Sequence, residues 1–184
     1  ERVILFDQRG CGKSMPAGEM KNNTAAKLVD DAKRLLDFLK IKKKVIVRGG
    51  SWESALALLF AEKYPSMVYK LVLSQIFLAN EDDLKWSYET SGLFYPEFLE
   101  KMMGKSKDKM EMLKYYADLI SSKNMVKQAE AVRVFGGYEF MMGSLEPKEA
   151  DEVTIDWINY NKIFINYAAK AFTLKDNQII KNLD

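Results

Sequence analysis

Val45-Ile-Val-Arg-Gly-Gly-Ser-Trp-Glu-Ser54 is the stretch that decides the fold of this chain. A β-branched run ends in two glycines and a serine, and an apolar helical pattern follows through Trp52, Ala55, Leu56, Leu59 and Phe60. A strand, a sharp turn and a helix in this order predict a nucleophile elbow, G-x-S-x-G, in which a strained backbone lifts the serine hydroxyl clear of the sheet. Glu53 stands where that pattern has its last glycine. The alternative is an ordinary Gly-Gly turn between a strand and a helix.

Length and composition exclude several classes of protein. The 184 residues suit one domain, or one and part of another, and 48% of them are apolar. No apolar run approaches the roughly 18 residues of a membrane helix, so we expect no membrane partner. The net charge of +2 gives no case for nucleic acid. The single cysteine, Cys11, excludes an internal disulfide, and no secretory segment stands at the start. Both observations favour a reducing compartment, the cytoplasm.

The chain contains no histidine. A Ser-His-Asp triad therefore cannot be assembled from these residues alone, and an imidazole metal site is excluded as well. With only one cysteine, a zinc site is not expected. We expect no metal and no cofactor.

The order of the predicted elements indicates an α/β fold with a parallel sheet. Strands are predicted at 2–6, 45–48 and 69–74, and amphipathic helices at 24–39, where Thr24 offers an N-cap, and at 52–64. After residue 80 the strand signals fade, and methionines and aromatics recur at helical spacing near 81–91, 96–103, 107–121, 124–142 and 151–171. The methionines indicate core packing rather than a cofactor site.

The loop Asp7-Gln-Arg-Gly-Cys-Gly-Lys-Ser14 is rich in glycine and follows the first predicted strand. One interpretation is a phosphate-binding loop, because Gly12-Lys13-Ser14 matches the end of G-x-x-x-x-G-K-[ST]. However, Asp7 stands in place of the first glycine, and Pro16 disfavours the helix whose amides would hold the phosphate. A nucleotide-binding protein that uses Lys13 is the weakest alternative for the function.

Several motifs together resemble one family. They are Asp7-Gln-Arg-Gly-Cys-Gly-Lys-Ser14, Asn23-Thr24, Leu28-Val29-x-Asp31, Gly49-Gly-Ser-Trp52, Ser54-x-Leu56-Ala57-Leu58, Tyr64-Pro65, Leu71-Val-Leu73, Ile76-Phe-Leu78 and Phe94-x-Pro96-Glu97. This set resembles the prolyl aminopeptidases (proline iminopeptidases), α/β-hydrolase serine peptidases that remove an N-terminal proline from peptides. The resemblance is dense from residue 3 to about residue 100 and implies that the glycine loop is a turn after a strand.

The resemblance implies a fold and a domain division. We expect a partial α/β-hydrolase core with a parallel sheet and a helical cap, divided into core residues 1–78, cap residues 79–172 and residues 173–184, which return toward the core.

The resemblance also assigns roles to individual residues. Ser51 becomes the acylating nucleophile, and the backbone N–H of Trp52 becomes an oxyanion-hole donor. Glu139 looks like the cap glutamate that binds the free amine of the substrate, and Phe77 and Tyr88 stand where family aromatics line the proline pocket. The alternatives are a solvated helix acid for Glu139 and core packing for both aromatics.

Three departures from the family pattern limit the prediction. Phe164 occupies the place of the second amine-binding glutamate, which leaves Glu139 without a carboxylate partner. The family's H-G-G-P-G oxyanion loop is missing, and so are the catalytic aspartate and histidine. We therefore expect an internal fragment of a longer protein, inactive on its own and not independently stable. The missing strands would come from elsewhere in that protein, from a partner chain or from a second copy. The rival interpretation is a non-catalytic binding module or degenerate α/β-hydrolase paralogue.

Overall fold

The computed structural model describes residues 2–144 and 152–183, and its contacts divide the chain into two compact units. The helical unit comprises Glu1–Lys21 and Leu84–Lys170. The sheet unit comprises Asn22–Asp83 and Ala171–Asp184. The predicted boundaries after residues 78 and 172 stay predictions, and residues 145–151 of the predicted cap lie outside the described part of the chain.

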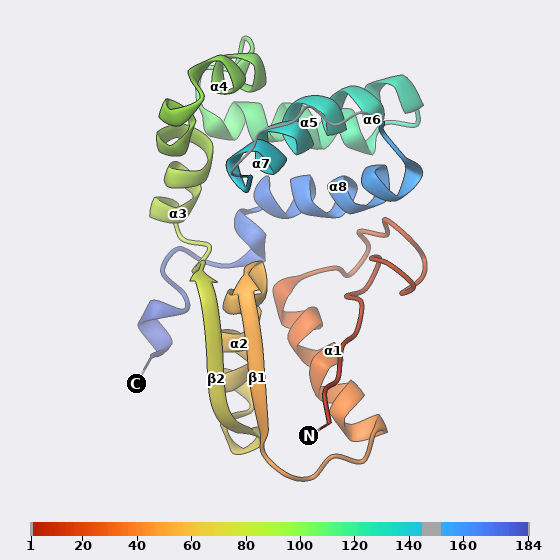
Figure 1. Ribbon diagram of the computed structural model, residues 1–184, viewed down its shortest axis with the longest axis vertical. Helices are drawn as coiled ribbons and strands as arrows, with labels where there is room; N and C mark the ends of the chain where they lie inside the picture. Colours follow the sequence, from red (N-terminus) through yellow and green to blue (C-terminus); the bar gives the residue numbers. More distant parts are fainter. Residues whose placement is uncertain (1, 145–151, 184) are drawn as a thin grey trace. The chain divides into compact units, whose positions relative to one another are not determined.

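The sheet unit is built on two parallel strands, β1 (Val45–Ser51) and β2 (Val68–Ile76). The register pairs Ile46 with Lys70 and Gly49 with Leu73. The helix α2 (Trp52–Lys63) packs against both strands, and a short 3-10 turn, η1 (Pro65–Met67), leads from it into β2 (Figure 1). The strand–helix–strand order and the parallel pairing confirm the α/β class that the sequence predicted.

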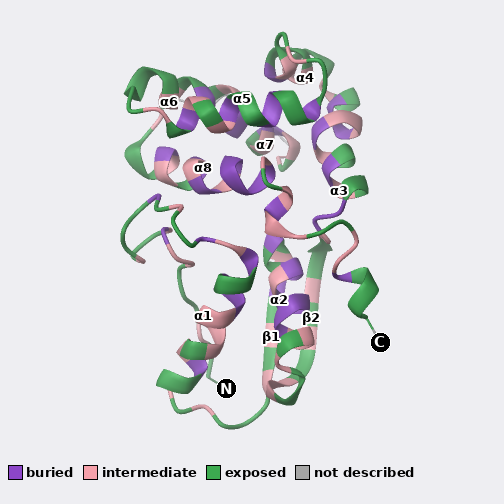
Figure 2. Ribbon diagram, turned by 180° about the vertical axis from the view of Figure 1, so that it is seen from behind, coloured by how far each residue is buried: buried purple, intermediate pink, exposed green. Residues whose placement is uncertain are grey.

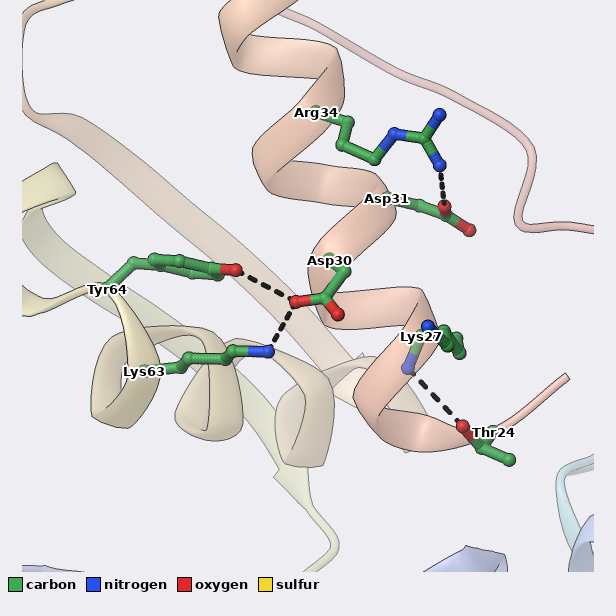
Figure 3. Close-up of polar contacts among 7 residues, drawn as sticks. All are labelled: Thr24, Lys27, Asp30, Asp31, Arg34, Lys63 and Tyr64. Atoms are coloured by element: carbon green, nitrogen blue, oxygen red, sulfur yellow. Dashed lines mark hydrogen bonds and ion pairs between the residues drawn. The ribbon is translucent and has the colours of Figure 1, made fainter. Parts of the chain in front are cut away.

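The helix α1 (Ala25–Phe38) begins at the predicted N-cap, since the Thr24 hydroxyl accepts a hydrogen bond from the Lys27 N–H at 3.4 Å. Its apolar face packs against α2. A polar cluster joins the two helices at their edge (Figure 3). There the Asp30 carboxylate accepts hydrogen bonds from the Lys63 ammonium and from the Tyr64 hydroxyl, the latter at 2.8 Å. These hydrogen bonds lower the pKa of Asp30, with the bond from Lys63 as the largest cause.

The end of the chain is attached to the same unit. It contains two 3-10 turns, η5 (Ala171–Thr173) and η6 (Ile180–Asn182). Asn177 accepts a hydrogen bond from Asn80 at 3.2 Å, and Asp176 accepts one from the Glu81 N–H at 3.0 Å. The residues after Lys170 that the structure describes therefore pack in the sheet unit as turns, and the expected division at residue 173 stays a prediction.

The prediction of a strand at residues 2–6 is wrong. Residues 2–6 have no regular secondary structure, and Val3, Leu5 and Phe6 are exposed. An extended segment becomes a strand only when a neighbour supplies the ladder of hydrogen bonds. Among the described residues no strand pairs with this segment, and the sheet contains β1 and β2 alone.

The helical unit confirms the change of character after residue 80. Its elements, with the helix α3 that leads into it, are α3 (Glu81–Lys85), the π-helical turn η2 (Trp86–Thr90), η3 (Ser91–Phe94), α4 (Pro96–Met103), α5 (Lys109–Ser121), α6 (Met125–Ala131), the π-helical turn η4 (Val132–Gly136), α7 (Gly137–Met142) and α8 (Ile155–Ala168). The helices α5 and α8 pack side by side (Figure 1). Both helices contain buried residues (Figure 2), among them Met112 and Leu113 of α5 and Ile165 of α8.

We predict that Asp30→Asn weakens the packing of α1 on α2. The loss should be up to about 1 kcal/mol, because the ion pair is partly exposed and solvent screens it. A lowered carboxyl pKa stabilises the fold above the ordinary Asp value of about 4, and this contribution disappears as the pH falls through that range. Denaturant unfolding of the intact protein at pH 7 and pH 3 measures both effects. Asp31→Asn is the matched control, since Asp31 lies on the same helix and its ion pair with the exposed Arg34 is long, at 3.9 Å. Equal losses in both variants would contradict the prediction.

Candidate active site

Ser51 is the last residue of β1 and directly precedes the first residue of α2. Its backbone has φ 53° and ψ −125°, a conformation that residues with a Cβ atom rarely adopt. The residue is exposed. This is the strained strand-to-helix turn that the sequence predicted, and it favours a nucleophile elbow over an ordinary Gly-Gly turn.

Two neighbours hold the turn. A Cβ atom on Gly49 would overlap the backbone carbonyl of Glu53, so only glycine allows β1 and the start of α2 to approach so closely. Ser54 is fully buried, and its hydroxyl donates to the Ser51 carbonyl at 2.6 Å and accepts from the Phe77 N–H at 2.9 Å. Ser54 thus ties the turn to the segment that follows β2. The Glu53 residue is exposed, as expected for a side chain in the place of the motif's last glycine.

An aromatic cluster packs beneath the turn. The ring of Phe172 lies 4.9 Å from the ring of Trp52 and 4.9 Å from the ring of Phe77. Trp52 is buried and begins α2, so its backbone N–H belongs to the positive end of the helix dipole. Phe77 is half-buried in this cluster. The sequence analysis missed Phe172 and the bridging role of Ser54.

The other predicted site residues lie in the helical unit, around a pocket of about 790 Å³. Glu139 and Phe164 line it, together with Gly10, Cys11, Gly12, Lys13, Ala17, Gly136, Phe140, Asp156, Trp157, Asn159, Tyr160 and Asn161. The buried Tyr88 hydroxyl hydrogen-bonds the Glu139 carboxylate, and its ring packs on Phe135 at 5.6 Å. Glu139 and Phe164 thus line one pocket and Tyr88 contacts Glu139, while the roles that the resemblance gives these residues stay predictions. Ser51, Trp52 and Phe77 form a separate group in the sheet unit.

Burial raises the pKa of Glu139 to about 7, and the hydrogen bond from Tyr88 lowers it in part. Burial also raises the pKa of Tyr88. A carboxyl group with this pKa is half ionised near neutral pH. Its ionised form is poorly solvated, and a nearby cation would stabilise it.

Two π-helical turns position this carboxyl group. Tyr88 lies in η2, and Glu139 follows η4 by three residues. Gly136 ends η4, where a Cβ atom would come within 2.7 Å of the Asn161 side-chain oxygen. The glycine therefore lets η4 lie close against α8. Because π-helical turns occur frequently at functional sites, the π-helical turn that holds Tyr88 and the one just before Glu139 are signals that the sequence pattern did not reveal.

The glycine loop is not a phosphate cradle. The Lys13 N–H donates to the Asp7 carboxylate at 2.9 Å, and the N–H groups of Gly10, Cys11 and Ser14 donate to carbonyls of the same loop. The amides that would hold a phosphate already have acceptors, and Asp7 adds a negative charge beside them. This removes the support for a nucleotide-binding protein.

Among the described residues, no cluster of three or more His, Cys, Asp or Glu side chains could hold a metal ion. No helix in that part of the chain has both the length and the apolar content needed to cross a bilayer.

A scan of protein families identifies the class of protein. The model described as alpha/beta hydrolase fold matches residues 1–129, and the chain belongs to this family. Within it, the chain is similar to proteins named proline iminopeptidase. One from Arabidopsis thaliana is 31% identical over 195 residues, covering 100% of this chain and 50% of that protein.

Bacterial relatives agree with this result. A proline iminopeptidase of Neisseria meningitidis serogroup A is 32% identical over 185 residues, covering 98% of this chain and 59% of that protein. One from Xylella fastidiosa is 43% identical over 88 residues, which are 48% of this chain and 28% of that protein. The resemblance to the prolyl aminopeptidases is confirmed. The chain spans about half of the length of the relatives that match it from end to end.

We predict that Gly49→Ala disrupts the elbow while Glu53→Gly does not. The added methyl group collides with the Glu53 carbonyl and should cost about 1–3 kcal/mol, with loss of any activity that depends on Ser51. Glu53→Gly should change stability by no more than about 1 kcal/mol and keep activity. Denaturant unfolding and turnover by the intact protein measure both. A fully folded but inactive Glu53→Gly variant would show that the glutamate itself takes part in the reaction.

We predict that Glu139→Gln stabilises the intact protein at pH 8. A raised carboxyl pKa means that the folded state holds its proton more tightly, so stability falls as the pH rises from about 4.5 to about 7. The full shift in the pKa of Glu139 sets an upper limit of roughly 3 kcal/mol for the loss in the free energy of unfolding. The gain from Glu139→Gln should vanish at pH 4.

Other ionisable side chains lie in or near this pocket, those of Tyr88, Tyr138, Tyr160, Asp156, Lys13 and Cys11. Unfolding between pH 4 and pH 8 should therefore be compared with Glu130→Gln, which removes an exposed carboxylate from α6. A destabilising Glu139→Gln at pH 8 would contradict the prediction.

Proposed function

We propose that this chain is the elbow-bearing part of a serine aminopeptidase that releases N-terminal proline from peptides by acyl transfer. The conformation of Ser51, at φ 53° and ψ −125°, is the observation that carries the proposal. A strained residue persists only where the surrounding structure enforces it, and such strain is concentrated at functional sites. The relatives named proline iminopeptidase support the choice of reaction and of substrate.

In this mechanism the Ser51 Oγ attacks the carbonyl carbon of the N-terminal residue while a general base takes its proton. The Trp52 N–H, at the positive end of α2, stabilises the negative charge that develops on the carbonyl oxygen. The tetrahedral intermediate collapses, the peptide amine leaves with a proton, and water then hydrolyses the acyl-enzyme. Since the chain has no histidine, the imidazole base of such a mechanism comes from residues outside it. Residues 1–184 alone are accordingly proposed to be inactive.

Recognition of the substrate amine falls to Glu139. Its half-buried side chain lines the pocket, and the Tyr88 hydroxyl donates a hydrogen bond to its carboxylate. Phe164 lines the same pocket in the place where the family pattern has a second acid. One carboxylate therefore faces the ammonium, and the protein should discriminate less strongly between free and blocked N-termini than a two-carboxylate site would. The single cysteine supports a cytoplasmic location, and Cys11 is not in a disulfide.

We predict that a fluorophosphonate probe labels Ser51 in the intact protein. Ser51→Ala should abolish labelling and lower kcat for a prolyl reporter by about six orders of magnitude. Ser66→Ala is the matched control, because Ser66 is an exposed serine outside the elbow. The preference for prolyl over N-blocked prolyl reporters should be about 10- to 150-fold weaker than for a two-carboxylate site.

Absence of labelling and of turnover in a folded intact protein would favour the rival function. That rival is a binding module or degenerate paralogue that keeps the pocket without the reaction. A strong preference for the free amine would show instead that the assignment of Phe164 is wrong.

A further inference from the structure

Ser54 is a fully buried polar residue that the proposed mechanism does not use. It lies in the first turn of α2, and its hydroxyl accepts a hydrogen bond from the Phe77 N–H at 2.9 Å. Two carbonyl oxygens lie within reach of the same hydroxyl, that of Ser51 at 2.6 Å and that of Phe77 at 3.3 Å. A hydroxyl has one proton to donate, so the much nearer Ser51 carbonyl receives it.

The contact with Phe77 distinguishes Ser54 from an ordinary helix serine. A serine in a helix often bonds a carbonyl three or four residues before it, and that bond alone has only local meaning. Here the hydroxyl oxygen is also held by an N–H that lies 23 residues further along the chain. A bulge precedes this N–H, since the pairing of β1 with β2 shifts at Ser51, where Gln75 at φ 49° is passed over. Bulges of this kind occur often next to active sites.

The Ser51 carbonyl and the Trp52 N–H belong to one peptide group. A peptide group is planar, so a bond that fixes the direction of its C=O also fixes the direction of its N–H. A hydrogen bond on the oxygen draws electrons from the nitrogen through the amide resonance, and the N–H becomes a stronger donor. Such polarisation strengthens each bond in a hydrogen-bonded chain by about 10–30%. The Ser54 hydroxyl therefore acts on the N–H that the proposed mechanism uses for the oxyanion.

We infer that Ser54 is a positioning residue for the oxyanion hole, because its hydroxyl orients and polarises the peptide group that carries the Trp52 N–H. A chain of hydrogen bonds runs from the Phe77 N–H through the Ser54 hydroxyl to the Ser51 carbonyl. The Trp52 N–H continues it to the negative charge on the substrate. The inference adds a residue to the proposed function and rests on that function for the roles of Ser51 and Trp52. Since Ser54 is enclosed, it acts through the peptide group and not by contact with the substrate.

Steady-state kinetics of the intact protein on a prolyl reporter test this role. Removal of a whole oxyanion-hole donor costs about 100- to 1000-fold in kcat, and a donor that stays but is less well oriented should cost less. We expect Ser54→Ala to lower kcat and kcat/KM alike, by about 10- to 100-fold, because the oxyanion forms only in the transition state. Thr24→Ala removes the N-cap of α1 in the same unit, and it should lower thermal stability without changing kcat. A Ser54→Ala variant that loses stability but keeps the wild-type kcat would overturn the inference.

A matched pair of variants separates the hydroxyl from the packing. Ser54→Thr and Ser54→Val add the same bulk at a fully buried position, and only the threonine keeps a hydroxyl. The kcat of Ser54→Thr should exceed that of Ser54→Val by about tenfold or more, and equal values would contradict the inference.

A transition-state analogue gives a second measurement on the same site. Pyrrolidine-2-boronic acid forms a tetrahedral adduct on a serine Oγ, and its affinity should fall in Ser54→Ala by the same factor as kcat/KM. The affinity for L-proline, which forms no such adduct, should stay the same. An equal loss for both ligands would show a general disturbance of the site and refute the positioning role.

Nuclear magnetic resonance distinguishes failure of this inference from failure of the proposed function. The ¹⁵N shift of a backbone amide responds to a hydrogen bond on the carbonyl of its own peptide group. In intact protein labelled with ¹⁵N-tryptophan, the Trp52 amide signal should move upfield in Ser54→Ala and return in Ser54→Thr. An unchanged Trp52 signal would sink the inference, and turnover that depends on Ser51 would then leave the aminopeptidase standing. The expected change of the signal in a protein without turnover would keep the polarised peptide group and refute the aminopeptidase.

Discussion

The backbone strain at Ser51 is the constraint on which the sheet unit depends. No residue separates β1 from α2, so the chain must change direction within one residue, and that residue takes a conformation that L-amino acids avoid. Such a conformation costs on the order of 1–3 kcal/mol and persists only if neighbours over-determine it. Gly49 has no Cβ atom to clash with the Glu53 carbonyl, and the Ser54 hydroxyl bonds the Ser51 carbonyl and the Phe77 N–H. The ring of Phe172 packs against those of Trp52 and Phe77.

The elements that the sequence predicted are those whose signals are local. The Thr24 cap, the apolar face of α1, the glycines near the end of β1 and the proline that begins α4 each lie within a few residues of the structure they determine. The segment 2–6 has the composition of a buried strand, but pairing depends on a partner that composition does not contain. The π-helical turns at Trp86–Thr90 and Val132–Gly136 were also not predicted, because contacts between distant helices decide where such turns form.

The residues of the candidate site likewise fall into those that a local sequence signal predicts and those that only the fold reveals. Ser51 could be predicted because the elbow motif is short and contiguous, and Glu139 and Tyr88 were found only through resemblance to a family. Phe172 and the role of Ser54 depend on which segments meet in the fold, and nothing in their immediate sequence reveals it. Trp157, Tyr160 and Phe164 stand in the sequence at spacings of three and four, a pattern that is also typical of a helix packed in a core. Only the fold shows that these three residues line a pocket.

Glu139 shows how a group can be unfavourable for the fold and favourable for binding. Below its pKa of about 7 the neutral acid is easily buried, and it offers a cation no charge. Above that value the carboxylate destabilises the folded state, and the same desolvated charge attracts an ammonium. A ligand that binds the folded state returns the lost stability by mass action. In the proposed function, the side chain that supports the fold least at high pH is therefore also the one that would hold the substrate ammonium most strongly there.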